Sequence, residues 1–464
     1  MSKLTQQFLW LVLFGVLAPI LGPRPYGLFS IVMVFVGLCE IVMIEAMSEA
    51  LITVGKLEPL HTSSANLVNG AIGFGFGIAM AILAPVIGML FHDDEIVHLV
   101  WALAPLPVLS ALSATPVALL RRSLQYRRLA VRSIAGLMIG GIFGIVLAIA
   151  GAGVWALALQ VLTQRFGEVT IAWMSVPVRL GFRWSATHFR EMKAVGMNVF
   201  AAQMLNLASG QLPRMILGYT LGPTQLGLFT MATRIADIIV VTTAMPYSAV
   251  GRIELRASKP GSQEFGRMFS AMTQNASILA FPLFLGTAAL VPDLFRLWLG
   301  ERWLAGIIPT QLILLGGLPF VFFYCIDAAL LAANMSLVFK RLAAVQTLTM
   351  IATVLCAAPF GLELTCLALA IRSWLLLPFF LLLMRRSCHL SVYDFLRLPI
   401  RSLMGAVVMA SILILPLLRP LWLRREYDFV LLVVIGMLCY GSFLYCFSRQ
   451  QLKSLLAGFF VRRT

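Results

Sequence analysis

The chain has 464 residues, of which 60% are hydrophobic and only 12% charged, and its formal net charge is +16. With a mean hydropathy of +0.94, this composition excludes an ordinary soluble globular domain and indicates a membrane protein. The seven cysteines lie mostly inside apolar runs, so we expect no disulfide framework.

Apolar runs long enough to cross a bilayer recur along the whole chain. A transmembrane helix needs roughly 17 to 25 apolar residues. The fourteen predicted spans cover residues 6–21, 27–51, 64–91, 96–120, 129–150, 154–176, 195–218, 226–250, 268–290, 305–333, 342–360, 362–384, 403–418 and 429–447. No small-residue cleavage site follows the first run, so we expect it to be retained rather than removed as a signal peptide.

The basic charge is distributed unevenly between the two sides of the predicted membrane. With the N-terminus inside, 25 of the 35 Lys and Arg residues fall on the inner side, six fall on the outer side and four lie within spans. This is the positive-inside pattern, and it explains the net charge without a nucleic-acid partner. We therefore expect both termini to be cytoplasmic. Topology and attraction to anionic lipids are also sufficient to explain the clustered Arg121, Arg122, Arg127 and Arg128, although these residues could attract an anionic head group before it enters.

A ten-residue phrase occurs twice in the chain. LGPRPYGLFS at 21–30 returns as LGPTQLGLFT at 221–230, and two weaker echoes, YRRLA against FKRLA and LAL against LAL, follow in the same order. Gly and Pro in this arrangement predict a turn between two helices. Six spans separate the two copies, so the halves have the same orientation and form a parallel repeat, whose interface usually binds the transported molecule.

The predicted architecture is an all-α polytopic membrane protein with about fourteen transmembrane helices in two pseudo-symmetric six-helix bundles. Residues 1–178 form the first bundle and residues 195–386 the second. Residues 179–194 are predicted to form a cytoplasmic amphipathic linker with Trp184 and Phe189 facing the membrane. Residues 387–464 add two helices and a cytoplasmic tail.

These motifs resemble a known family. The first-loop LGPxxYGLF, the basic RRSLQYRRLA segment, the GAGVWALAL entry to span six and the second-half LGPTQLGLFTMATRI are similar to the polysaccharide-export flippases. These belong to the fourteen-span branch of the multidrug/oligosaccharidyl-lipid/polysaccharide exporter superfamily. The resemblance implies a multi-pass protein of the bacterial inner membrane that moves an undecaprenyl-pyrophosphate-linked oligosaccharide outward for exopolysaccharide, capsule or O-antigen synthesis. It also implies membrane lipids as partners, and a polysaccharide polymerase and export machinery as further ones.

Such a cargo requires a polar, cationic cavity, because its hydroxyls and pyrophosphate lose water in hydrocarbon. Ionisable residues within spans are the candidates, since they are costly to keep there. Span seven carries a polar row that forms one broad helical face: Asn198, Gln203, Asn206, Gln211 and Arg214. Arg214 either contacts a phosphate or extends to the outer interface.

Two arginines are spaced i to i+3 from an acid on the same predicted helix. Arg165 precedes Glu168 in span six, and Arg234 precedes Asp237 in span eight. Both spacings predict internal ion pairs. A structural role is favoured for both pairs, because an arginine that is already paired with an acid attracts an anionic ligand less strongly.

The remaining candidates have no such partner on their own helix. Arg372 in span twelve is either a free cavity cation or the partner of Asp327 across helices. Glu40, Glu45 and Glu49 in span two either couple transport to a cation or face water near the inner end. The candidate substrate-binding residues are thus Arg214, Arg372, Arg234, Arg165, Asn206 and Gln211, and the coupling or ion-pair candidates are Asp237, Glu168, Asp327 and Glu45.

No nucleotide-binding loop, protease or hydrolase motif, or zinc spacing occurs in the sequence, so we expect neither an enzyme nor a cofactor. Three rival functions remain open. A cation-coupled multidrug exporter of the same superfamily would need acids rather than four arginines in these spans. A polysaccharide polymerase or ligase would need a large outer loop. A peptidoglycan-precursor flippase shares the pyrophosphate cargo.

Overall fold

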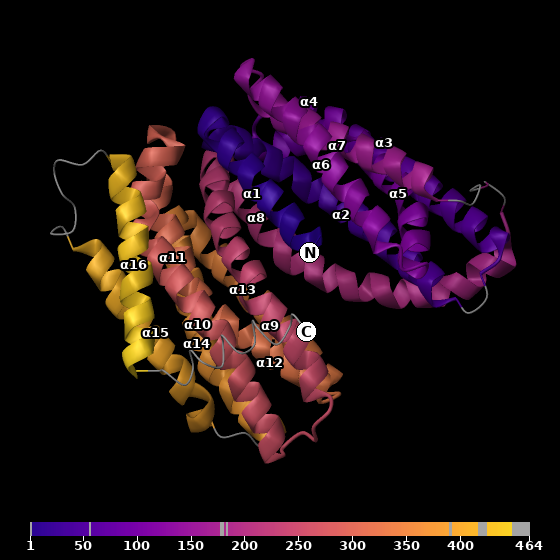
Figure 1. The fold of residues 1–464 in the computed structure, drawn as a ribbon. Helices are drawn as coiled ribbons and strands as arrows, with labels where there is room; N and C mark the ends of the chain where they lie inside the picture. The colour runs from indigo at the N-terminus through magenta and orange to yellow at the C-terminus, as the bar shows by residue number, and fades with distance from the viewer. Residues whose placement is uncertain are drawn as a thin grey trace. The chain divides into compact units, whose positions relative to one another are not determined.

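The computed structural model describes residues 2–54, 57–176, 181, 184–388, 392–415 and 425–447. Within these ranges every regular element is helical (Figure 1). Two compact units are present, Met1–Thr230 and Met231–Thr464. The first contains α1 (Ser2–Leu21), α2 (Pro23–Thr53), α3 (Pro59–Phe91), α4 (Asp94–Leu103), α5 (Pro105–Arg122), α6 (Tyr126–Ile149), α7 (Val154–Ser175) and most of α8 (Ala186–Thr242).

The second unit contains the end of α8 and all later elements. They are α9 (Ala244–Leu255), α10 (Gln263–Leu294), the π-helix η1 (Phe295–Leu299), the 3₁₀ helix η2 (Glu301–Gly306), α11 (Ile307–Gly317), α12 (Phe320–Ala332), α13 (Ser336–Ala357), the 3₁₀ helix η3 (Ala358–Phe360), α14 (Leu362–Cys388), α15 (Val392–Ile414) and α16 (Arg425–Phe447).

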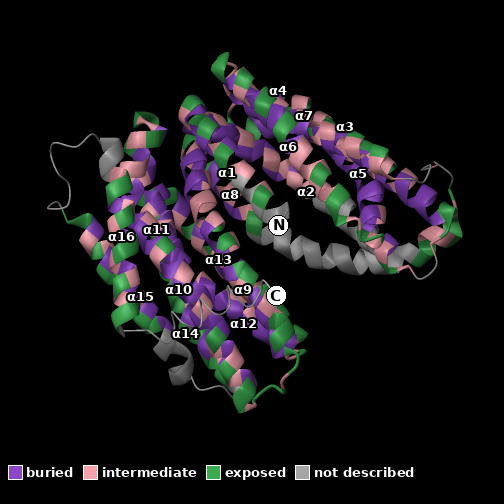
Figure 2. Cartoon of the chain, viewed as in Figure 1, coloured by how far each residue is buried: buried purple, intermediate pink, exposed green. Residues whose placement is uncertain are grey.

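Among the described residues, nine helical stretches are long and apolar enough to cross a membrane, and two shorter apolar helices accompany them. Many residues along these helices are exposed (Figure 2), and large apolar side chains are among them. On α3, for example, Ile82 is 69% exposed and Met89 is 75% exposed. Such surfaces are stable in hydrocarbon and costly in water, so the chain is a multi-pass membrane protein, as its composition predicts.

The duplication seen in the sequence is repeated in the backbone. Eight of the ten described residues with positive φ form four pairs roughly 200 to 210 residues apart: Gly22 with Gly222, His92 with Gly300, Leu124 with Asn334, and Gly153 with Gly361. The turns at Leu124 and Asn334 also share a hydrogen-bond pattern, in which the following amide donates to the carbonyl five residues before it. Both turns therefore end a helix with the same left-handed cap.

The arginines of the RRSLQYRRLA segment have different roles in the structure. Arg122 donates to the last carbonyls of α2, including that of Leu51 at 2.8 Å, and Arg128 donates to the carbonyl of Ser175 at the end of α7. A cation at a helix C-terminus satisfies free carbonyls and complements the helix dipole. Arg121 and Arg127 are exposed instead. Two of the four clustered charges thus cap helices in the first unit.

The predicted linker, 179–194, lies partly outside the described residues. Helix α8 begins at Ala186 and consists of two helical segments that meet in a kink at Gly222. Trp184, just before this helix, is half exposed and packs its ring against Phe189 at a centroid distance of 5.2 Å. The linker therefore leads directly into span seven.

The last two helices belong to the second unit. Helix α15 packs along α10 and against α16. The buried Tyr440 of α16 donates from its hydroxyl to the carbonyl of Ile278 in α10, at 2.9 Å. This hydrogen bond anchors α16 to the body of the second unit.

Candidate functional site

The two copies of the repeated phrase pack against each other within the first unit. A Cβ atom on Gly27 would lie 1.6 Å from the carbonyl oxygen of Pro223, and one on Gly227 would lie 1.9 Å from the carbonyl oxygen of Pro23. Only glycine permits this reciprocal approach of two backbones. We call the two phrases, 21–30 and 221–230, the paired turns.

A hydrogen bond joins equivalent residues of the paired turns. The hydroxyls of Ser30 and Thr230, 200 residues apart, lie 3.2 Å from each other. Ser30 also donates to the carbonyl of Tyr26 in its own helix. The sequence explains the phrase only as a turn that reports ancestry, whereas the structure gives the duplication a physical role, because each copy is the packing surface of the other.

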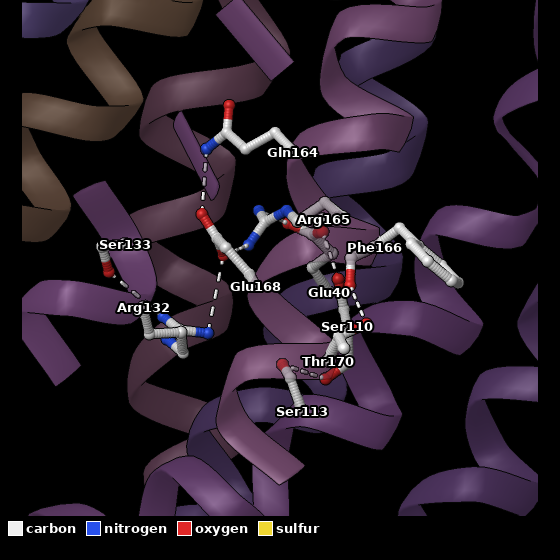
Figure 3. A network of polar contacts seen from close by, with 10 residues as sticks. All are labelled: Glu40, Ser110, Ser113, Arg132, Ser133, Gln164, Arg165, Phe166, Glu168 and Thr170. Atoms are coloured by element: carbon white, nitrogen blue, oxygen red, sulfur yellow. Dashed lines mark hydrogen bonds and ion pairs between the residues drawn. The ribbon is translucent and has the colours of Figure 1, made fainter. Parts of the chain in front are cut away.

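A second site lies among four helices of the first unit, where two arginines and two glutamates meet (Figure 3). On α7, Arg165 approaches Glu168 at 3.5 Å and Glu40 of α2 at 3.1 Å. Arg132 of α6 approaches Glu168 at 3.5 Å. We call Glu40, Arg132, Arg165 and Glu168 the charge network.

Neutral side chains complete the charge network. Gln164 donates to Glu168 at 2.9 Å, and Ser110 of α5 donates to Glu40. The Glu168 side chain is only 5% exposed. Two cations and two anions leave no net charge, and removal of any one would leave a buried charge uncompensated. The network therefore ties α2, α5, α6 and α7 together.

Glycines on α6 make room for the buried polar face of α7. A Cβ on Gly136 would lie 2.5 Å from Cγ of Glu168, and one on Gly140 would lie 2.5 Å from the carbonyl oxygen of Gln160. Close helix approach at small residues is typical of membrane packing. These glycines bring the Glu168 carboxylate within reach of Arg132.

The predicted ion pair between Arg165 and Glu168 is present, but sequence reasoning missed half of the charge network. Arg132 was not among the candidates, although it follows Ala130 and Val131 inside α6. Glu40 was considered only as part of a row of acids. The signal was available in part, since both residues interrupt apolar helices, but their pairing depends on contacts between helices far apart in sequence.

In the second unit, the hydrogen bonds of Arg372 of α14 to other described residues go to neutral groups. Its Nη1 donates to the carbonyl of Gln346 and to the hydroxyl of Thr349 on α13, each at 3.3 Å. Its Nε and the Nε2 of Gln346 are buried without a partner. No carboxylate among the described residues, Asp327 included, lies within ion-pair distance of Arg372. Arg372 therefore does not pair with Asp327 in the described part of the chain, and its role as a cavity cation stays a prediction.

The other candidates are spread over both units. Gln211 of α8 lies against α2, because a Cβ on Gly37 would be 3.1 Å from its Nε2. Arg214 is half-buried on the same helix. The side chains of Asn206 and Glu45 lie outside the described residues.

Two aspartates of the second unit lie near one tyrosine. Asp237 of α8 is exposed, Arg234 one turn before it is half-buried, and Asp327 of α12 is half-buried. Both aspartates lie within electrostatic reach of Tyr324. Among the described residues, no group of three or more His, Cys, Asp or Glu side chains is placed to hold a metal ion.

Solved structures of membrane proteins share this fold. The chain superimposes on the lipid II flippase MurJ in an inward closed conformation with a TM-score of 0.79 at 14% identity, covering 97% of this chain and 98% of that one. A multidrug resistance MATE family transporter in an inward-facing conformation gives a TM-score of 0.59 at 15% identity, covering 88% and 95%.

The sequence pattern of the family described as "Polysaccharide biosynthesis protein" matches residues 16–308. The chain belongs to this family, as its motifs predict.

The names of two related proteins each state a biosynthetic process. The succinoglycan biosynthesis transport protein ExoT of Rhizobium meliloti (strain 1021) is 22% identical over 302 residues, 65% of this chain and 58% of that protein. The teichuronic acid biosynthesis protein TuaB of Bacillus subtilis (strain 168) is 21% identical over 252 residues, 52% of this chain and 50% of that protein. The aligned region thus spans somewhat more than half of ExoT and half of TuaB.

Proposed function

We propose that the chain is a flippase of the bacterial inner membrane that moves a polyprenyl-pyrophosphate-linked oligosaccharide outward for cell-surface polysaccharide synthesis. Its partners are then the glycan lipid, the surrounding membrane lipids and the polymerase and export machinery that use the product. Family membership and the name of the ExoT transport protein support this proposal. The positive-inside charge pattern supports cytoplasmic termini. The chain acts as a transporter, not an enzyme.

The observation that supports an anionic cargo is the neutral environment of the Arg372 guanidinium. A cation inside an apolar helix costs free energy unless an anion or several acceptors compensate it. Arg372 has neutral acceptors on one nitrogen and a buried Nε without a partner. A diphosphate offers charge-assisted hydrogen bonds of the kind a guanidinium accommodates best. We propose that Arg372 contacts the pyrophosphate; the same role for Arg214 stays a prediction from the sequence.

The charge network supports a different role for Arg165. Its guanidinium is shared between Glu40 and Glu168, so little of its field is left for a ligand. We propose that the network holds the helices of the first half together during transport.

Alternating access follows from the parallel repeat as the proposed mechanism. We propose that the halves 1–178 and 195–386 move relative to each other and that the paired turns separate in each cycle. The hydroxyl–hydroxyl bond between Ser30 and Thr230 is weak enough to break each time.

A cross-link tests this mechanism. The two hydroxyl oxygens lie 3.2 Å apart, which places the side chains within reach of a disulfide. In a chain whose native cysteines are replaced by serine, Ser30→Cys with Thr230→Cys should stop transport when oxidised and restore it when reduced. Each single cysteine is the control. Undiminished transport with complete cross-linking would exclude opening at this point.

The cargo itself is tested in cells of the source strain. Deletion of the gene should leave a complete polyprenyl-pyrophosphate repeat unit on the cytoplasmic leaflet, identified by mass spectrometry of extracted lipids. Re-expression of the chain should clear it, whereas Arg372→Gln should clear it less and Arg121→Gln fully. If the glycan lipid crosses normally and only drug sensitivity changes, the protein is a multidrug exporter and not a flippase for this lipid. A trapped peptidoglycan precursor would identify that cargo instead.

A further inference from the structure

Five hydrogen bonds join a tryptophan, glutamine or tyrosine side chain to a main-chain carbonyl of another helix. The donors lie on α4, α7, α11, α14 and α16. The pairs are Trp101 with Ala81 at 3.0 Å, Trp173 with Leu112 at 3.0 Å, Gln311 with Ala288 at 2.9 Å, Trp374 with Leu315 at 3.2 Å and Tyr440 with Ile278 at 2.9 Å. We call these five side chains the carbonyl donors.

Each of the five acceptors is the carbonyl four residues before a proline. In an α-helix this carbonyl accepts from the amide N–H four residues later, and proline has no N–H. Prolines make up 22 of the 464 residues, so about one carbonyl in twenty has this position. Coincidence would account for one such acceptor but not for five. The prolines that follow the acceptors are, in the same order, Pro85, Pro116, Pro292, Pro319 and Pro282.

A carbonyl that a proline has freed needs another donor inside a membrane. Hydrocarbon offers none, so an unpaired carbonyl there costs free energy. Trp101 is 50% exposed and Trp374 is 41% exposed, so each ring keeps much of its surface exposed while its N–H reaches a neighbouring helix. Tryptophan combines a large apolar ring with one N–H donor. These side chains therefore replace the amide N–H that the proline lacks.

One of these bonds occurs in both halves of the duplicated chain. Trp173 of α7 donates to α5, and Trp374 of α14 donates to α11. Helices α5 and α7 belong to the fourth and sixth predicted spans, and α11 and α14 have the same places in the second half. The two donors lie roughly 200 residues apart, and so do the two acceptors. The fourth span of each half is thus held to the sixth in the same way.

Helix α10 is held at two points. Both Pro282 and Pro292 lie inside this helix. Tyr440 of α16 donates to the carbonyl freed by the first proline, and Gln311 of α11 donates to the carbonyl freed by the second. Each interruption of α10 is therefore paired with a donor from a different helix.

We infer that the carbonyl donors are inter-helix pins, each of which supplies the hydrogen bond that a proline withholds and fixes the proline-interrupted helix to a neighbour. A proline weakens a helix and permits it to bend, and a donor held on a second helix limits that bend. Each of the five pins joins two helices of the same unit. The pins therefore stiffen each unit internally, whatever cargo the protein carries.

Double-mutant cycles in the full-length protein in lipid nanodiscs test this inference. Trp173→Phe and Tyr440→Phe each remove one donor and keep an aromatic ring. Pro116→Ala and Pro282→Ala each return the amide N–H that the corresponding carbonyl lacks. Each Phe variant alone should lower the midpoint of thermal unfolding, followed by circular dichroism, by about 2–4 °C. Combined with the substitution of its own proline, the same Phe variant should cause little further loss, because the carbonyl already has a donor.

The proline of the other unit is the matched control. Trp173→Phe should cost as much with Pro282→Ala as in the parent, and Tyr440→Phe as much with Pro116→Ala. Three outcomes would overturn the inference. An undiminished loss beside its own substituted proline would show that the ring only packs. Rescue by either proline substitution would indicate a general gain of helix stability, and no loss in either Phe variant would show that these bonds do not hold the helices.

Discussion

Alanine at Gly27 is the most direct test of the packing between the paired turns. A Cβ there would lie 1.6 Å from the carbonyl oxygen of Pro223 and 2.4 Å from its carbon, whereas real Cβ atoms essentially never come closer than 3.0 Å. The two turns must therefore separate by about 1.4 Å. The opposing atom belongs to a backbone carbonyl, so no side chain can rotate away.

Overpacking of a well-packed site costs typically about 1–3 kcal/mol, and we expect Gly27→Ala near the upper end because backbone must move. Gly227→Ala, at 1.9 Å from the carbonyl oxygen of Pro23, should cost slightly less. Because both substitutions force apart the same contact, the double variant should lose less than the two single losses combined.

Thermal unfolding of the purified protein, followed by its nine tryptophans, measures the effect. Gly70→Ala on α3 is the matched control, since nothing lies within 4 Å of a Cβ there and alanine favours a helix by up to about 1 kcal/mol. Gly27→Ala should lower the midpoint by several degrees relative to this control. A midpoint equal to or above that of Gly70→Ala would refute the reasoning.

Three further predictions concern stability and use the same assay. Glu168→Gln should destabilise by about 3–5 kcal/mol, because Arg132 then loses the carboxylate that it contacts and Arg165 keeps only Glu40. Adding Arg132→Gln should recover part of the loss; an unchanged free energy of unfolding in the single variant would show that the network does not stabilise the fold. Arg122→Gln should cost about 1.5–3 kcal/mol by uncapping α2, while the exposed Arg121→Gln should stay within about 0.5 kcal/mol; equal effects would contradict the capping role. Tyr440→Phe should cost about 1 kcal/mol by removing the hydrogen bond to α10, and a neutral result would show that this bond does not anchor α16.

The sequence alone determined the class of protein. Hydropathy is a sum over neighbouring residues, so fourteen apolar runs identify a membrane protein without any knowledge of contacts. The repeated phrase identifies the parallel duplication for the same reason, and the left-handed residues confirm it in the backbone. The motifs also identified the family.

Tertiary structure decided which charges pair. The i to i+3 spacing of Arg165 and Glu168 is local, and that pair was predictable. Arg132 and Glu40 join it from other helices, and their membership depends on the approach of α6 and α2 to α7. For Arg372, the sequence left a free cation and an ion pair open, because no local rule places Asp327 relative to α14.

The glycines of the repeated phrase show the same division. Sequence rules explain Gly22 and Gly222 as turn residues, because positive φ is a local property of the backbone. Gly27 and Gly227 lie in ordinary helical segments. A side chain is excluded at these two positions only because it would collide with the opposing turn. Local chemistry therefore predicted the turn, whereas only the three-dimensional structure could show that each copy is packed against the other.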